Sequence, residues 1–268
     1  MPTNDSFDIP SENEHPVSDE SSGTLQETTS RQRCAFQAAS KEIYRRSGSP
    51  TGDPASLGVE AGTLEEWSRD YRKIVQVGHF QDYQLVSNHT SEHKVFFDES
   101  KKRAFKHTWP GVFGQIPCVV KGHLDRRNAT PSEYLQRMAL QLEVFGGDIE
   151  LEGVYTSDEP SMIIGQPAGQ PSLVISQKWY EQSGAVTTES IHDLLAHEGF
   201  RGVPNSYFGF YRPSDGVAIV DAKPDNFVQT TEGLIPIDLQ MTIFTPEQLR
   251  DANLTSDGTE PVIFIPRG

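Results

Sequence analysis

The chain of 268 residues is poor in cysteine, in clustered positive charge and in long apolar runs. Its two cysteines, Cys34 and Cys118, are far apart in unlike contexts, so we expect neither a disulfide framework nor a cysteine-based metal site. The formal net charge is −15, and no Lys/Arg block offers an interface for nucleic-acid phosphates. No apolar run approaches the length of a membrane span, and no basic-then-apolar leader is present. We therefore expect a cytoplasmic protein that binds neither nucleic acid nor membrane.

Large apolar side chains are scarce at the N-terminus. Residues 1–30 contain seven carboxylates and neither Lys nor Arg, a composition typical of disordered segments. The next residues predict one short helix over 32–46, followed by a Gly- and Pro-rich break. We therefore expect residues 1–61 to form an acidic, mostly disordered tail, and residues 62–268 to form the folded domain.

The first part of that domain has the periodicity of an α+β fold. Thr63 can cap a helix that carries Trp67 and Tyr71 on one side. A second helix begins after Thr130, because Pro131 suits the first turn and Glu133 has the spacing of a capping box, and it ends at Gly146-Gly147. Alternating side chains predict five antiparallel strands, at 83–86, 94–98, 103–107, 149–155 and 172–176, with a less regular extended piece at 118–122.

The second part of the domain predicts a helix and two hairpins. The helix covers residues 187–197. One hairpin joins strands 207–211 and 217–220, and the other joins strands 227–229 and 234–237. We place the boundary between an N-lobe and a smaller C-lobe near residues 177 and 178.

The polar motif Asp221-x-Lys223-Pro224-x-Asn226 follows the apolar strand at 217–220. Transfer of a phosphoryl group from ATP needs a carboxylate for the hydroxyl proton, a cation near the phosphate and oxygen ligands for Mg²⁺, and this motif offers all three. Asp238 follows the last strand of the second hairpin, which brings it near Asn226, so that both can bind one Mg²⁺ ion.

These residues resemble the catalytic loop of eukaryotic-type protein kinases, and Asp238 resembles the metal-binding Asp of their D-F-G motif. More narrowly, residues 92–240 resemble the protein-kinase-like domain of bacterial and phage polyvalent proteins. The segments that carry this resemblance are 105–108, 110–114, 130–135, 176–177 and 221–227. The resemblance implies a two-lobe fold with a five-stranded antiparallel N-lobe, one main helix and a reduced C-lobe.

The resemblance also implies residue roles. Asp221 would be the catalytic base, Lys223 would neutralise the γ-phosphate, and Asn226 with Asp238 would bind Mg²⁺. Lys106 would contact the α- and β-phosphates of ATP. Its carboxylate partner on the following helix would be Glu133, with Glu143 as the second choice, and the backbone around Gln177 and Lys178, within residues 176–179, would bind adenine.

Several kinase features are missing from the sequence. The turn at residues 87–92 has no G-x-G-x-x-G pattern, Leu239-Gln240 replaces Phe-Gly, and 28 residues follow Gln240 without an A-P-E-like segment. We therefore expect no conventional activation loop and a changed mode of acceptor recognition. The favoured activity is transfer to a protein Ser/Thr hydroxyl.

Other interpretations stay open at this point. The chain could be a small-molecule kinase of the aminoglycoside or sugar type, or a pseudokinase that binds nucleotide as an interaction module. The motif at 221–226 could be only a polar turn, Lys106 a solvated strand residue, and Glu133 only a helix cap. His192 and His197 are five residues apart on a helix, which is not the spacing of a zinc-binding pair.

Overall fold

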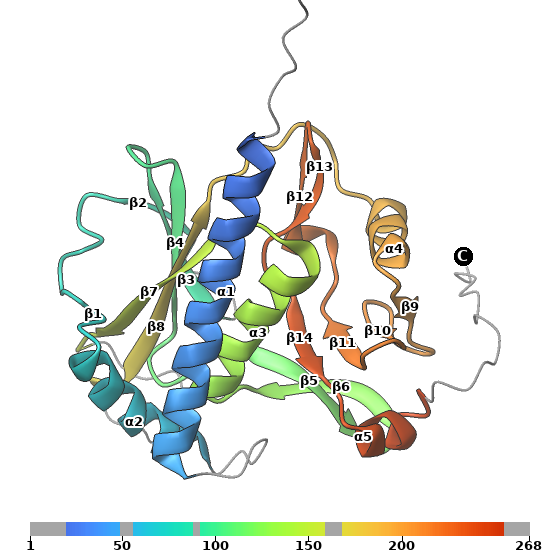
Figure 1. The fold of residues 1–268 in the computed structure, drawn as a ribbon, viewed down its shortest axis with the longest axis horizontal. Coiled ribbons are helices and arrows are strands. Elements are labelled where there is room, and N and C mark those ends of the chain that lie inside the picture. Colours follow the sequence, from blue (N-terminus) through green and yellow to red (C-terminus); the bar gives the residue numbers. More distant parts are fainter. Residues whose placement is uncertain (1–19, 49–55, 88–91, 159–167, 255–268) are drawn as a thin grey trace, which may run out of the picture.

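A six-stranded sheet forms one side of the computed structural model, which describes residues 20–48, 56–87, 92–158 and 168–254 (Figure 1). The strand order is β1-β7-β8-β4-β3-β2, and all neighbouring pairs are antiparallel except β1 and β7. The strands are β1 Ile74–Val75, β2 Gln84–Ser87, β3 His93–Asp98, β4 Arg103–Thr108, β7 Ile149–Thr156 and β8 Pro171–Lys178. The α+β expectation and the five predicted strands are confirmed, and the two-residue β1 adds a sixth.

Helix α3, Pro131–Phe145, packs on this sheet and begins as its sequence predicts. The Thr130 hydroxyl accepts from the backbone N–H of Glu133, while the Glu133 carboxylate accepts from the backbone N–H of Thr130. This reciprocal capping box satisfies two N–H groups that would otherwise lack partners at the helix start. Gly146, with a φ of 69°, ends the helix.

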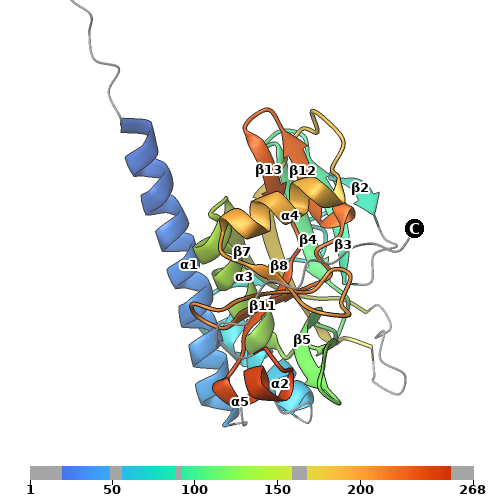
Figure 2. The same cartoon turned by 90° about the vertical axis from the view of Figure 1, so that its right-hand side faces the viewer.

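Helix α1, Glu20–Ser47, lies along α3 on its outer side (Figures 1 and 2). Phe36 and Ile43 are fully buried in the same apolar cluster as Leu135 of α3, and the Ser40 hydroxyl donates to the carbonyl of Ser132 over 2.8 Å. The short helix expected at 32–46 is therefore present as part of a longer helix, and its apolar face joins the folded core. Residues 1–19 of the predicted tail lie outside the described residues.

Helix α2, Ser56–Asp70, starts seven residues before the predicted cap. Thr63 lies inside the helix, where its hydroxyl donates to the carbonyl of Val59 over 3.0 Å, so the predicted N-cap is wrong. Trp67 is buried as expected. After the helix, Ile74 and Val75 form β1, which pairs in parallel with β7.

A two-stranded hairpin lies between β4 and α3. Its strands are β5 Gln115–Val120 and β6 His123–Asn128, and its turn residues Lys121 and Gly122 both have positive φ, as tight hairpin turns require. The extended piece expected at 118–122 therefore corresponds to the end of β5 and the turn after it. Strand β6 was not predicted, because its sequence is polar and most of its side chains are exposed.

The C-terminal part contains a four-stranded sheet and a separate hairpin on the other side of α3 (Figure 1). The sheet has the order β14-β11-β10-β9, and β12 pairs with β13. These elements are α4 Thr188–His197, β9 Arg201–Gly202, β10 Phe210–Arg212, β11 Val217–Val220, the 3₁₀ turn Pro224–Asn226, β12 Phe227–Thr230, β13 Gly233–Pro236, β14 Gln240–Ile243 and α5 Pro246–Asp251. Both predicted hairpins and the α4 helix are confirmed. In the described part of the chain, none of the helices combines the length and apolar character that a bilayer span requires.

Candidate active site

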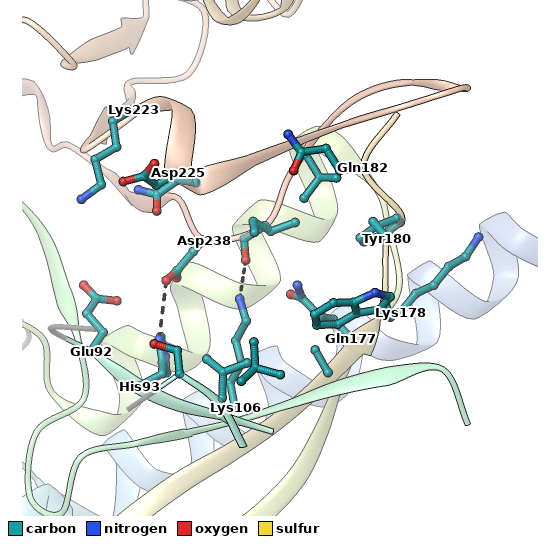
Figure 3. A pocket seen from close by; sticks show the side chains of 18 of the residues that line it. Glu92, His93, Lys106, Gln177, Lys178, Tyr180, Gln182, Lys223, Asp225 and Asp238 are labelled. Carbon is teal, nitrogen blue, oxygen red and sulfur yellow. Dashed lines mark hydrogen bonds and ion pairs between the residues drawn. The ribbon is translucent and has the colours of Figure 1, made fainter. Parts of the chain in front are cut away.

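A cavity of about 830 Å³ lies between the six-stranded sheet and the C-terminal part. Figure 3 shows charged side chains, including Glu92 and Asp238, on one side of it, and Gln177 and Tyr180 on the other. The predicted site residues that line this cavity are Lys106, Gln177, Lys178, Asp221, Lys223, Asn226 and Asp238. Chain folding thus brings together residues that the sequence separates by more than a hundred positions.

The loop after β11 holds Asp221 in a fixed orientation. Its backbone φ is 61°, a left-handed conformation that few non-glycine residues adopt. The side-chain amide of Asn226 donates to the Asp221 carbonyl over 2.6 Å and to its carboxylate over 3.1 Å, and the Lys223 ammonium lies 3.0 Å from the same carboxylate oxygen. Arg126 of β6 approaches the other oxygen at 3.7 Å. Asp221 is therefore a carboxylate at the cavity wall with cations beside it.

Asn226 and Asp238 are neighbours because the hairpin β12–β13 joins them. Phe227 pairs with Pro236, and the Ile237 N–H donates to the Asn226 carbonyl over 2.9 Å. The side-chain nitrogen of Asn226 is engaged with Asp221, which turns its amide oxygen to the opposite side. Both residues line the cavity, and their oxygens are the ligand type that Mg²⁺ prefers. The hairpin β12–β13 does not pair with β11, which pairs with β14 instead.

Lys106 on β4 is buried and points into the cavity. Its ammonium donates to the carbonyl of Ile237 over 2.8 Å (Figure 3). Burial lowers the pKa of Lys106 below its ordinary value, and the carboxylates of Asp238 and Glu92 oppose that effect only in part. The interpretation of Lys106 as a solvated strand residue is therefore wrong.

Asp238 lies near two cations, Lys106 and Arg137, and near His93. Burial by itself would raise the pKa of its carboxyl, but Lys106, His93 and Arg137 together hold that pKa far below the usual range. One oxygen, Oδ1, accepts from Arg137 over 2.6 Å, and the other, Oδ2, lies 3.5 Å from Nδ1 of His93. Asp238 is therefore an anion at any pH near neutrality, as a metal ligand must be.

The predicted pairing of Glu133 with Lys106 is not found. Glu133 accepts two hydrogen bonds from the guanidinium of Arg127 and completes the capping box at Thr130. It faces a different cavity, together with the exposed second-choice residue Glu143. A capping-box Glu must point back towards the helix start, which directs it away from the lysine.

Sequence reasoning missed a buried group formed by Glu92, His93 and Arg137. Glu92, His93 and Asp238 offer ligand atoms that lie within 4.8 Å of one another, and Arg137 bonds to both carboxylates. One signal was available: Glu133, Arg137 and Gln141 recur every four residues on α3, so they form a polar line on a helix whose other positions are mostly apolar.

The segment after β8 was predicted to bind adenine through the backbone of residues 176–179. Within it, the N–H of Lys178 donates to Asp148 over 3.2 Å and the N–H of Trp179 donates to Lys102 over 2.9 Å. These two donors are occupied. Among the described residues no acceptor takes the N–H of Tyr180, which also lines the cavity. Gln177 directs its side chain to the cavity beside Ala104, its partner across the sheet.

The cavity also has an apolar lining. Val95 and Ala104 come from β3 and β4, whereas Val228 and Ile237 come from the β12–β13 hairpin and its end. A flat ring between these two groups would bury apolar surface on both of its faces. The arrangement therefore combines an apolar slot with a charged end.

No protein-family model, curated protein or solved structure matches this chain. Chemically, the charged end presents a carboxylate that can take a proton, two cations that can bind anionic oxygens, and two oxygen ligands for a divalent cation.

Proposed function

We propose that this protein is an ATP- and Mg²⁺-dependent phosphotransferase with a protein-kinase-like two-lobe fold, which acts on a protein Ser/Thr hydroxyl. The observation that carries the proposal is the convergence of Lys106, the Asp221–Asn226 loop and Asp238 on one cavity. The fold is compatible with it, because Lys106 lies on the third of the five antiparallel strands and one long helix, α3, packs behind them.

Each residue would have a separate task. ATP supplies the phosphoryl group, and Asn226 with Asp238 would hold its Mg²⁺. Asp221 would accept the proton of the acceptor hydroxyl as the oxygen bonds to the γ-phosphorus and the bond to the ADP oxygen breaks. Lys223, 3.0 Å from Asp221, would balance the negative charge on the transferring group. Lys106 would bind the remaining phosphates, since its buried ammonium makes a strong electrostatic contact.

The apolar slot would hold the adenine ring. Val95 and Ala104 would cover one face, and Val228 and Ile237 the other. The backbone N–H of Tyr180 would donate to a ring nitrogen, in place of the occupied N–H groups of Lys178 and Trp179. This arrangement supports a nucleotide rather than a bare phosphate ester as the phosphoryl donor.

A transfer assay with radiolabelled ATP tests the proposal. Wild-type protein, Asp221→Ala and Asp238→Ala are incubated with Mg²⁺ and with a mixture of acceptor proteins. We expect label on the protein itself or on an acceptor protein, and a loss of about 100-fold or more in both variants. Label found only on an added aminoglycoside or sugar would instead favour a small-molecule kinase. Normal transfer by Asp221→Ala would refute the catalytic assignment.

A nucleotide-binding module without transfer activity is the second candidate. The observation that favours it is the tight pairing of Asp238 with Arg137, since a carboxylate bound by a guanidinium is a weaker metal ligand. Binding of Mg²⁺ and ATP by the wild type, with no transfer to any acceptor, would select this candidate.

A further inference from the structure

Arg137 lies at the centre of α3, and its side chain is completely buried. Its Nη2 donates to Asp238 over 2.6 Å and its Nη1 donates to Glu92 over 2.7 Å. The same guanidinium donates to the carbonyls of Gln115, at 3.0 Å, and Leu239, at 2.7 Å. One side chain therefore ties together the start of β3, the start of β5 and the segment that carries Asp238.

The charge of Arg137 is matched by the groups around it. Burial alone would lower its pKa, but Glu92 and Asp238 raise the pKa above its ordinary value, so the guanidinium stays charged. Two cations, Lys106 and Arg137, thus face two carboxylates, Glu92 and Asp238. Breaking one part of such a buried group leaves the others uncompensated, which is costly.

Helix α3 binds the Asp238 segment at more than one point. One turn after Arg137, the side chain of Gln141 donates to the Pro236 carbonyl over 3.1 Å and accepts from the Leu239 N–H over 3.3 Å. The backbone on both sides of Asp238 is therefore fixed to the helix. Of the two Asp238 oxygens, Arg137 takes Oδ1, whereas Oδ2 has only the longer contact of 3.5 Å with Nδ1 of His93, so Oδ2 is the oxygen that a metal ion in the cavity would bind.

The helix itself is held in place from behind. Helix α1 packs along α3 through Phe36 and Ile43, and Ser40 bonds to the first turn of α3. A helix that is braced on one side and bonded to the site on the other can transmit its position to Asp238.

We propose that Arg137 is a positioning residue that orients Asp238 for Mg²⁺, with Glu92 as its counter-ion. Helix α3 thus contributes a cation, Arg137, to the site. From the resemblance to kinases we expected this helix to contribute a carboxylate that pairs with Lys106. This inference rests on the proposed function, because it assigns a role within the same nucleotide site.

Binding of an ATP analogue, measured with and without Mg²⁺, tests the role. In Arg137→Lys a shorter, non-planar cation can no longer bridge Asp238, Glu92 and Leu239 at once. We expect the Mg²⁺ concentration for half-maximal binding to rise about 10- to 100-fold, as for other residues that orient metal ligands. Binding of the analogue in EDTA should stay within about twofold of the wild type, because Lys106 and the apolar slot are unchanged.

Arg127→Lys is the matched control. Arg127 also forms an ion pair with a residue of α3, Glu133, but this pair does not include Asp238. The control should therefore leave the Mg²⁺ dependence unchanged. Glu92→Gln removes the counter-ion with little change in shape and leaves Asp238 as the only carboxylate bound to Arg137. It should also raise the Mg²⁺ requirement, so it provides the test if Arg137→Lys does not fold.

The outcomes separate this inference from the proposed function. A wild type that binds no Mg²⁺–nucleotide overturns both. If the wild type binds it, and a folded Arg137→Lys or Glu92→Gln variant has the same Mg²⁺ dependence as Arg127→Lys, only the positioning role is overturned. Equal losses of binding with and without Mg²⁺ would also overturn it, because they would show that Arg137 only stabilises the fold.

Discussion

The ammonium of Lys106 donates a hydrogen bond of 2.8 Å to the backbone carbonyl of Ile237, the residue immediately before Asp238. The bond links the middle of the six-stranded sheet to the C-terminal part across the cavity. It also places the buried Lys106 cation near the half-buried Asp238 carboxylate, and this cation is one reason that Asp238 keeps its charge. Lys106 therefore holds the two sides of the site together as well as facing the space where phosphates would bind.

Replacing Lys106 tests its role in transfer. In Lys106→Met the length of the side chain is kept, but the cation and its bond to Ile237 are lost. We expect phosphoryl transfer to fall about 100-fold or more, because a preorganised positive charge is removed from the site. The control is Lys94→Met on the neighbouring strand, since Lys94 lies 5.3 Å from the ring of Trp109 and not at the cavity wall. Equal activity of the two variants would rule out a catalytic contribution from Lys106.

Replacing Glu133 should affect stability and not nucleotide binding. In Glu133→Gln the ion pair with Arg127 and the charged half of the capping box are lost, whereas the cavity is unchanged. We expect the free energy of unfolding to drop by about 1 kcal/mol, and the affinity for ATP to stay the same. Urea unfolding and nucleotide titration measure the two effects. Glu143→Gln, at an exposed position of the same helix, should change neither; a tenfold loss of ATP affinity in Glu133→Gln alone would restore the predicted pairing with Lys106.

The features that could be predicted from the sequence are those determined by residues close together in the chain. The start of α3 follows from Thr130, Pro131 and Glu133, because a capping box requires only four consecutive residues. The Asp221–Asn226 loop and its position after a strand are equally local. Asp238 could be placed near Asn226 because a short hairpin joins them.

Other features depend on contacts between distant residues. The cluster around Arg137 joins residues 92, 137 and 238, and no local pattern relates them. Strand β6 carries polar residues on both faces and a single apolar residue, Leu124, so it shows no apolar–polar alternation. The short helix predicted at 32–46 is part of α1, which begins twelve residues earlier, at Glu20, in a stretch whose composition favours disorder. The apolar positions that stabilise the helix against α3, including Phe36 and Ile43, lie in its predicted part.

The buried face of α1 can be tested by a cavity mutation. Phe36 is fully buried between α1 and α3, so Phe36→Ala should lower the free energy of unfolding by about 3 to 5 kcal/mol. Leu25→Ala, on the same helix but 61% exposed, should change it by less than about 0.5 kcal/mol. Chemical denaturation of the full chain measures both. If Phe36→Ala were as stable as Leu25→Ala, α1 would not be part of the folded core, and it could not brace the helix that carries Arg137.

The pKa of Asp238 predicts how stability changes with pH. Its carboxyl has a lower pKa in the folded protein than its ordinary value of 3.8, so the folded state binds the proton less readily than the unfolded state. The contribution of Asp238 to stability is therefore complete above pH 5 and is lost as the pH falls below about 4.

We expect Asp238→Asn to be less stable than the wild type by about 2 kcal/mol at pH 7, with a difference that shrinks towards pH 3. Urea unfolding of both proteins at pH 7, 5, 4 and 3 measures this difference. If it stayed constant down to pH 3, the loss would come from packing and not from the charge that Lys106 and Arg137 stabilise, and the electrostatic basis of the proposed metal site would be wrong.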